Sequence, residues 1–221
     1  LTRPSMRRRF PLAPGTGPSD AVPMTVLGPT PPYIPIGLTD YARLREDGYT
    51  YVDKTSFVAE VLANGASSML VPRPRRFGKT LNMSTLRYFL ERDPERDRTA
   101  IFDDTYVWTA EGGRFREHFQ RYPVITLSFR DVVADSWPTM WVSVRNEVQQ
   151  AFQVVEQDPR VWDAANRFTH DAQWLKRAMA AEASPAELGE ALERLSKWLH
   201  AVTGERAWIL IDEYDAPLLG A

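Results

Sequence analysis

The sequence predicts an α/β fold with a mostly parallel sheet and helices on both of its faces. Two segments, 123–129 and 207–212, are rich in β-branched and other apolar residues, as buried parallel strands are. Longer segments with helical periodicity alternate with them, and strands alternating with helices are typical of α/β proteins.

Length and composition indicate an ordinary globular protein. The chain has 221 residues, of which 43% are hydrophobic and 25% charged, enough for one large domain with a core. A net charge of −2 argues against a strongly basic nucleic-acid binder, and the lack of cysteine excludes disulfides and cysteine-bound zinc. No apolar run approaches the roughly 18 residues of a membrane helix, so we expect a cytoplasmic protein without a membrane partner.

Residues 1–32 are expected to form a disordered, Pro- and Gly-rich leader, and residues 33–221 the folded domain. Arg7-Arg8-Arg9 is followed by Pro-rich sequence instead of an apolar segment, which argues against a secretory signal. A nucleic-acid-binding arm is the alternative to a solvated tail for these three arginines.

Four elements are expected in the first half of the domain. A helix covers 39–45, and a second runs from Asp53 to a stop at Asn64-Gly65. A short strand, 69–71, ends at Pro72, because proline cannot continue a central ladder. A helix then follows Lys79 and ends before Pro94.

Three helical segments are expected between the two apolar strands. An apolar stripe at 3.6-residue spacing begins at Ser136 and extends to Val155. The segment 160–182 is also expected to be helical. Ser184-Pro185-Ala186-Glu187 is a capping box that opens an amphipathic helix, which Gly204 closes.

Gly78-Lys79-Thr80 stands between an apolar run and a helix, which is the layout of a phosphate-binding loop (P-loop). In such a loop Lys79 would reach the β- and γ-phosphates, and the Thr80 hydroxyl would coordinate Mg²⁺. The general pattern G-x-x-x-x-G-K-[ST] is only half matched, because Arg73 stands in place of the first glycine.

Asp212 and Glu213 end the last apolar strand. Ligands of open parallel sheets bind beyond the carboxyl ends of the strands, so this pair and the loop are expected to meet. Asp212 fits the carboxylate on the Mg²⁺ side, acting through a metal-bound water, and Glu213 fits the group that activates the attacking water. Each motif alone could be a surface helix start or a turn, but together they favour a Mg–ATP site.

Five segments resemble the bacterial AAA-ATPase-like family, whose members often carry a PD-(D/E)XK-type nuclease domain further downstream. They are Pro35-Ile36-Gly37, residues 51–55 (YVDKT), residues 73–81 (RPRRFGKTL), residues 122–129 (YPVITLSF) and residues 211–218 (IDEYDAPL). The resemblance covers about residues 33–221, and its RPRRFGKT and IDEYD segments are specific to the family. Arg73 is a normal part of that family's loop.

The resemblance implies a P-loop NTPase-type three-layer sandwich that binds ATP and Mg²⁺. The candidate nucleotide-binding residues are Arg75, Arg76, Phe77, Gly78, Lys79, Thr80 and Leu81. Metal binding is assigned to Thr80 and Asp212, and catalysis to Lys79 and Glu213. The segment around Ile36 and the 51–57 block could border the adenine.

The chain stops eight residues after Glu213. Compared with the family, it is therefore expected to be an N-terminal portion, truncated before the remaining elements. The family also suggests nucleic acid or a nuclease domain as a partner, and a homo-oligomer as a candidate assembly.

Three functions follow as hypotheses. The first is Mg-dependent hydrolysis of ATP to ADP and phosphate. The second is a nucleotide-gated regulatory module that binds ATP without turnover. The third is an interaction domain without nucleotide, which a separation of Lys79 and Asp212 above roughly 12 Å would favour.

Overall fold

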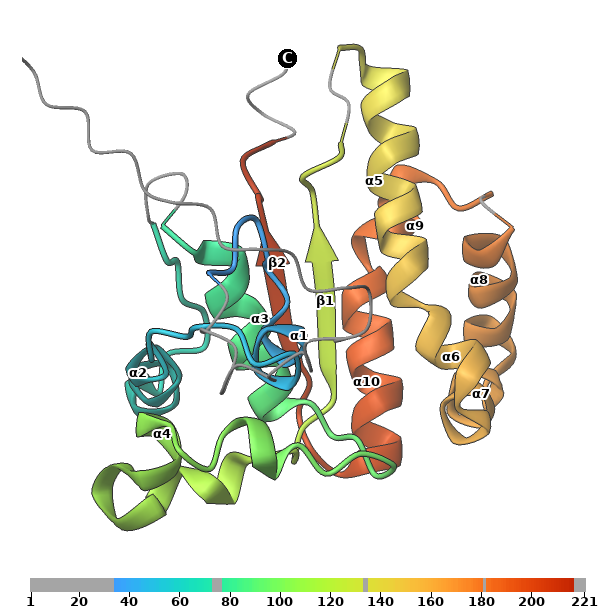
Figure 1. Ribbon diagram of the computed structural model, residues 1–221. Helices are drawn as coiled ribbons and strands as arrows, with labels where there is room; N and C mark the ends of the chain where they lie inside the picture. The colour runs from blue at the N-terminus through green and yellow to red at the C-terminus, as the bar shows by residue number, and fades with distance from the viewer. Residues whose placement is uncertain (1–33, 73–76, 133–134, 181, 217–221) are drawn as a thin grey trace, which may run out of the picture. The chain divides into compact units, whose positions relative to one another are not determined.

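The computed structural model describes residues 34–72, 77–132, 135–180 and 182–216. Within these ranges the protein is mixed α/β and mostly helical, with one small parallel sheet (Figure 1). The predicted leader, residues 1–32, and the loop residues Arg75 and Arg76 lie outside the described residues.

Along the chain the elements are α1 (Tyr41–Glu46), α2 (Ser56–Asn64), α3 (Lys79–Leu90), η1 (Thr99–Ile101), α4 (Tyr106–Thr109), η2 (Ala110–His118), β1 (Val124–Ser128), α5 (Trp137–Ala151), α6 (Gln153–Gln157), α7 (Pro159–Asn166), α8 (Thr169–Met179), α9 (Pro185–Gly189), α10 (Ala191–Thr203) and β2 (Trp208–Asp212).

The two predicted strands are confirmed, and they pair in parallel. Their register runs from Val124 beside Trp208 to Ser128 beside Asp212. The chain between them passes through α5 to α10, as a parallel connection requires a long crossover. Because both strands run the same way, the residues that follow Ser128 and Asp212 leave the sheet at the same edge.

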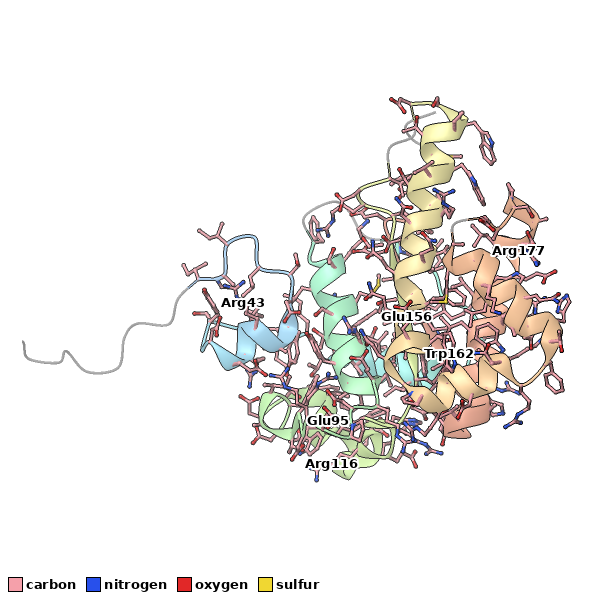
Figure 2. All side chains as sticks on the ribbon, turned by 90° about the vertical axis from the view of Figure 1, so that its right-hand side faces the viewer. Arg43, Glu95, Arg116, Glu156, Trp162 and Arg177 are labelled. Atoms are coloured by element: carbon pink, nitrogen blue, oxygen red, sulfur yellow. The ribbon has the colours of Figure 1, made fainter. Side chains whose placement is uncertain are left out.

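Helices cover both faces of this sheet (Figure 1). Ile125 belongs to an apolar cluster with α5 to α10, which includes the fully buried Trp174 and Leu195. Leu210 points to the other face and joins a cluster with α1 to α4 and η2, which includes Phe89. Figure 2 shows the two sides, with Glu156, Trp162 and Arg177 on the α6–α8 side and Arg43 and Arg116 on the other.

Local sequence signals set several helix ends. The Ser184 hydroxyl accepts the Glu187 N–H while the Glu187 carboxylate accepts the Ser184 N–H, so the predicted capping box is confirmed. Gly65 and Gly204 end α2 and α10 in the left-handed conformation, as predicted. The segment after Ser184 is nevertheless two helices, α9 and α10, since the helix breaks at Glu190 after Gly189.

The segment expected to be helical over 160–182 is helical in two parts, because the extended Phe168 separates α7 from α8, and both helices contribute apolar residues to one core. One other prediction needs correction. Segment 69–71 is not a strand, so the sheet has two strands in the described part of the chain. A strand requires a ladder partner, and no strand pairs with this segment, which leaves Leu70 64% exposed.

Candidate functional site

The N-terminus of α3 begins with Gly78 in the left-handed conformation, at φ 73° and ψ 26°. Glycine adopts this conformation without the steric cost that a Cβ imposes. Among the described residues no side chain caps this helix end. The N–H groups of the first turn, at Lys79, Thr80 and Leu81, have no acceptor within the helix, and this is the arrangement at which helices bind anions.

A hydrogen bond joins this helix to the end of β2. Thr80 Oγ1 donates to Asp212 Oδ2 at 2.8 Å, across a sequence separation of 132 residues. The Asp212 side chain is almost fully buried, and its other oxygen, Oδ1, accepts the Glu213 N–H at 3.0 Å. The two predicted motifs therefore meet at one edge of the sheet.

Glu213 turns its side chain toward Lys79. Its φ of 50° is in the left-handed region, which is uncommon for a residue with a side chain and often marks a functional site. Its Oε2 lies 3.8 Å from Lys79 Nζ, and both side chains are partly buried. The lysine and the acid assigned to catalysis thus form an ion pair with each other.

Arg130 also belongs to this edge, although neither of the two sequence motifs includes it. It stands two residues beyond β1, and its Nη2 donates to Thr80 Oγ1 at 2.8 Å and lies 3.8 Å from Asp212 Oδ2. The rule that ligands bind beyond the carboxyl ends of strands applies to β1 as well and could have identified it. Glu147 of α5 accepts the Ser128 N–H at 2.7 Å and so ties the end of β1 to α5.

Thr80, Arg130 and Asp212 lie on the wall of a cavity of about 1020 Å³. The cavity extends along β1 between α3 on one side and α5, α6, α7 and α10 on the other. Its size is in the range of sites that hold small molecules and cofactors.

Comparison with known proteins identifies the family. A family model named AAA-ATPase-like, with the description "Predicted AAA-ATPase", matches residues 35–221. The chain belongs to this AAA-ATPase-like family. An uncharacterized protein in the vnfD 5' region of Azotobacter chroococcum mcd 1 is 30% identical over 187 residues, which are 84% of this chain and 30% of that protein. The chain therefore spans less than a third of that relative's length, and no solved structure matches it significantly.

The side chains at the edge fit Mg²⁺ in the way expected of an AAA-ATPase-like protein. Mg²⁺ prefers oxygen ligands, and proteins usually bind it through one or two carboxylates together with water and substrate phosphates. Thr80 Oγ1 and Asp212 Oδ2 are oxygens of this kind and lie 2.8 Å apart, so both would be close to the ion, Thr80 directly and Asp212 through a bound water. In the part of the chain that the structure describes, no three His, Cys, Asp or Glu residues gather into a metal cluster, so the remaining ligands would be phosphate and water oxygens.

The structure brings Lys79, Thr80, Asp212 and Glu213 together, with Gly78 and Leu81 beside them in α3. The ring of Phe77 is 61% exposed just before this helix. A wide separation of Lys79 and Asp212 would have favoured an interaction domain that binds no nucleotide. The two residues are not widely separated, because Thr80, the neighbour of Lys79, contacts Asp212 directly. The roles of these residues remain predictions.

None of the helices in the described ranges combines the length and the apolar content that a bilayer crossing requires.

Proposed function

We propose that residues 33–221 are a P-loop NTPase-type domain that binds ATP with Mg²⁺ and hydrolyses it to ADP and phosphate. One observation carries the proposal. The hydrogen bond between Thr80 and Asp212 joins the two motifs that this chemistry needs, although 132 residues separate them. Membership of the AAA-ATPase-like family supports the same function.

The first turn of α3 and Lys79 would hold the phosphates. The uncapped N–H groups and the positive end of the helix dipole both favour an anion there. Lys79 would contact the β- and γ-phosphates, which attract the ammonium more strongly than the single charge of Glu213 does. Phosphate binding would thereby free the Glu213 carboxylate for a second role.

Thr80 and Asp212 would hold the metal, and Glu213 would act on water. When Mg²⁺ is bound, it neutralises the charge of the β- and γ-phosphates. Asp212 accepts the hydrogen bond of the Thr80 hydroxyl, which fixes the hydroxyl proton on the side of Asp212 and leaves the lone pairs of the Thr80 oxygen for a cation. Glu213, once released from Lys79, is positioned next to the metal ligands, where it can orient a water molecule and accept its proton.

Nucleotide titration of purified protein tests the proposal. We expect Lys79→Ala to weaken ATP binding in the presence of Mg²⁺ by about a hundredfold, which corresponds to about 2.7 kcal/mol. Lys197→Ala is the matched control, because Lys197 is an exposed lysine paired with Glu193 on α10. An unchanged ATP affinity in Lys79→Ala would refute the proposed site.

A second candidate is an ATP-binding module without turnover. The ion pair between Lys79 and Glu213 favours it, because a carboxylate held against the lysine is turned toward the lysine and not toward an attacking water. This candidate predicts measurable ATP affinity in the wild-type protein with no phosphate release at high protein concentration. Steady phosphate release that scales with protein concentration would exclude it.

A further inference from the structure

The positively charged side chain of Arg130 lies against Thr80 and Asp212, the two residues assigned to the metal. The guanidinium of Arg130 donates one N–H to Thr80 Oγ1 at 2.8 Å, and the same nitrogen lies 3.8 Å from Asp212 Oδ2. Arg130 reaches this place from the end of β1, 50 residues from Thr80, while about half of its side chain remains exposed. The side chain therefore has room to move.

Arg130 and a metal ion would compete for the same oxygen. A threonine hydroxyl has one proton and two lone pairs, and the Thr80 hydroxyl donates its one hydrogen bond to Asp212. Arg130 already uses one of the two lone pairs of Thr80 Oγ1, so a metal at this oxygen would have to share it with a guanidinium at 2.8 Å. A divalent cation at Thr80 and Asp212 would also repel a guanidinium held at hydrogen-bond distance from one of its ligands.

We propose that Arg130 leaves Thr80 when Mg–ATP binds and contacts the γ-phosphate, so that it makes the domain prefer ATP to ADP. This inference rests on the proposed function. If Thr80 and Asp212 hold Mg²⁺ together with a nucleotide, Arg130 would be one of the nearest positive side chains to the phosphates, because it lies against both of these residues. The planar guanidinium forms two parallel hydrogen bonds with a phosphate, which an ammonium does not.

The γ-phosphate is the favoured acceptor for a geometric reason. Lys79 and the first-turn N–H groups approach from α3, whereas Arg130 approaches from the end of β1, on the side of Asp212. The γ-phosphate is also the group that ADP lacks. An arginine that releases Thr80 only to contact this group discriminates between the two nucleotides.

The test compares the affinities of ATP and ADP, both with excess Mg²⁺, in four versions of the full chain. We expect Arg130→Ala to lower the ratio of ATP affinity to ADP affinity about tenfold, because ATP loses its contact with Arg130 while Mg–ADP no longer competes with Arg130 for Thr80. Arg130→Lys keeps the charge without the planar fork, so it should restore part of the preference for ATP. Arg43→Ala is the control, because Arg43 is an exposed arginine of α1 that pairs with Asp47 and does not line the cavity, and it should leave both affinities unchanged.

The outcomes separate this inference from the proposed function. If the wild-type protein binds neither nucleotide, the proposed function fails and the role of Arg130 fails with it. If the wild-type protein binds both and Arg130→Ala lowers both affinities equally, or neither, the proposed function stands and Arg130 does not select ATP. Thermal unfolding of each variant shows whether it folds. If Arg130→Ala does not fold, Arg130→Lys tests the role of the same residue.

Discussion

Two charged clusters in this protein are built in opposite ways. On α8 and α9, Glu187 accepts the N–H and the hydroxyl of Ser184 at 2.9 and 3.0 Å and also pairs with Arg177. We call these three residues the capping cluster. At the edge of the sheet, Thr80 contacts Arg130 and Asp212 across 50 and 132 residues. We call these three, together with Lys79 and Glu213, the edge cluster.

The difference is in how completely the polar groups are satisfied. In the capping cluster, hydrogen bonds from Ser184 and Arg177 stabilise the charged carboxylate and lower the pKa of Glu187 to about 2. All of its partners lie within ten residues. In the edge cluster, Lys79 and Glu213 are 3.8 Å apart and the N-terminus of α3 has no side-chain cap among the described residues. Groups with spare hydrogen-bonding capacity can bind a ligand, and saturated groups hold the fold.

The largest expected effect is in Glu213→Gln. If the edge cluster is catalytic, phosphate release should fall about thousandfold, the typical contribution of a general base, because an amide cannot accept the proton of water. ATP affinity should change by less than about threefold. Single-turnover phosphate release and nucleotide titration measure the two quantities separately.

Asp215→Asn is the matched control for that experiment. Asp215 lies two residues further along the same segment, and no contact with Lys79 or Thr80 involves it among the described residues. Equal losses in Glu213→Gln and Asp215→Asn would show that the segment tolerates no substitution. Glu213 would then have no special part in the reaction.

The same contrast explains what the sequence could predict. The capping box within the capping cluster was predicted, because Ser184, Pro185 and Glu187 are a local pattern whose hydrogen bonds form within one helical turn. Both strands of the sheet were also predicted, since their buried positions are a continuous run of apolar residues.

The edge cluster was predicted only in part. Its two motifs were found because each is a short pattern, but Arg130 belongs to neither. Arg130 becomes part of the cluster only through the register that places Ser128 beside Asp212. The register between two strands far apart in the sequence depends on packing across the whole domain. A local sequence pattern carries no information about that packing. The wrong strand at 69–71 has a similar cause, because its apolar side chains do not specify a partner strand.

A smaller effect is expected when the Thr80 hydroxyl is removed. Thr80→Val keeps the shape of the side chain but has no oxygen for a metal and no proton for Asp212. We expect ATP affinity in Mg²⁺ to fall about tenfold, equal to about 1.4 kcal/mol, and to become nearly insensitive to chelation of Mg²⁺. Thr80→Ser restores the hydroxyl and should recover most of the Mg²⁺ dependence. If valine and serine behave alike, the hydroxyl does not bind the metal.

The smallest effect, and the one that defines the capping cluster as structural, is expected for Glu187→Gln. The folded-state pKa of about 2 lies below the ordinary value of 4.5, chiefly because the Ser184 N–H stabilises the charged form. The stability that this charge contributes is therefore complete above about pH 4.5 and is lost as the pH falls toward 2. Urea unfolding at several pH values should show wild type more stable than the variant at pH 7, with the difference closing in that window.

Nucleotide affinity at pH 7 should be the same in Glu187→Gln and in wild type, because the capping cluster does not contribute to the edge cluster. Glu193→Gln is the control, since Lys197 lowers the pKa of this exposed carboxyl on α10 without the backbone N–H that Glu187 has. The stability difference between Glu193→Gln and wild type should therefore change less with pH than that of Glu187→Gln. A stability difference between Glu187→Gln and wild type that stays constant from pH 7 to pH 2 would mean that packing of the side chain, and not its charge, stabilises the start of α9.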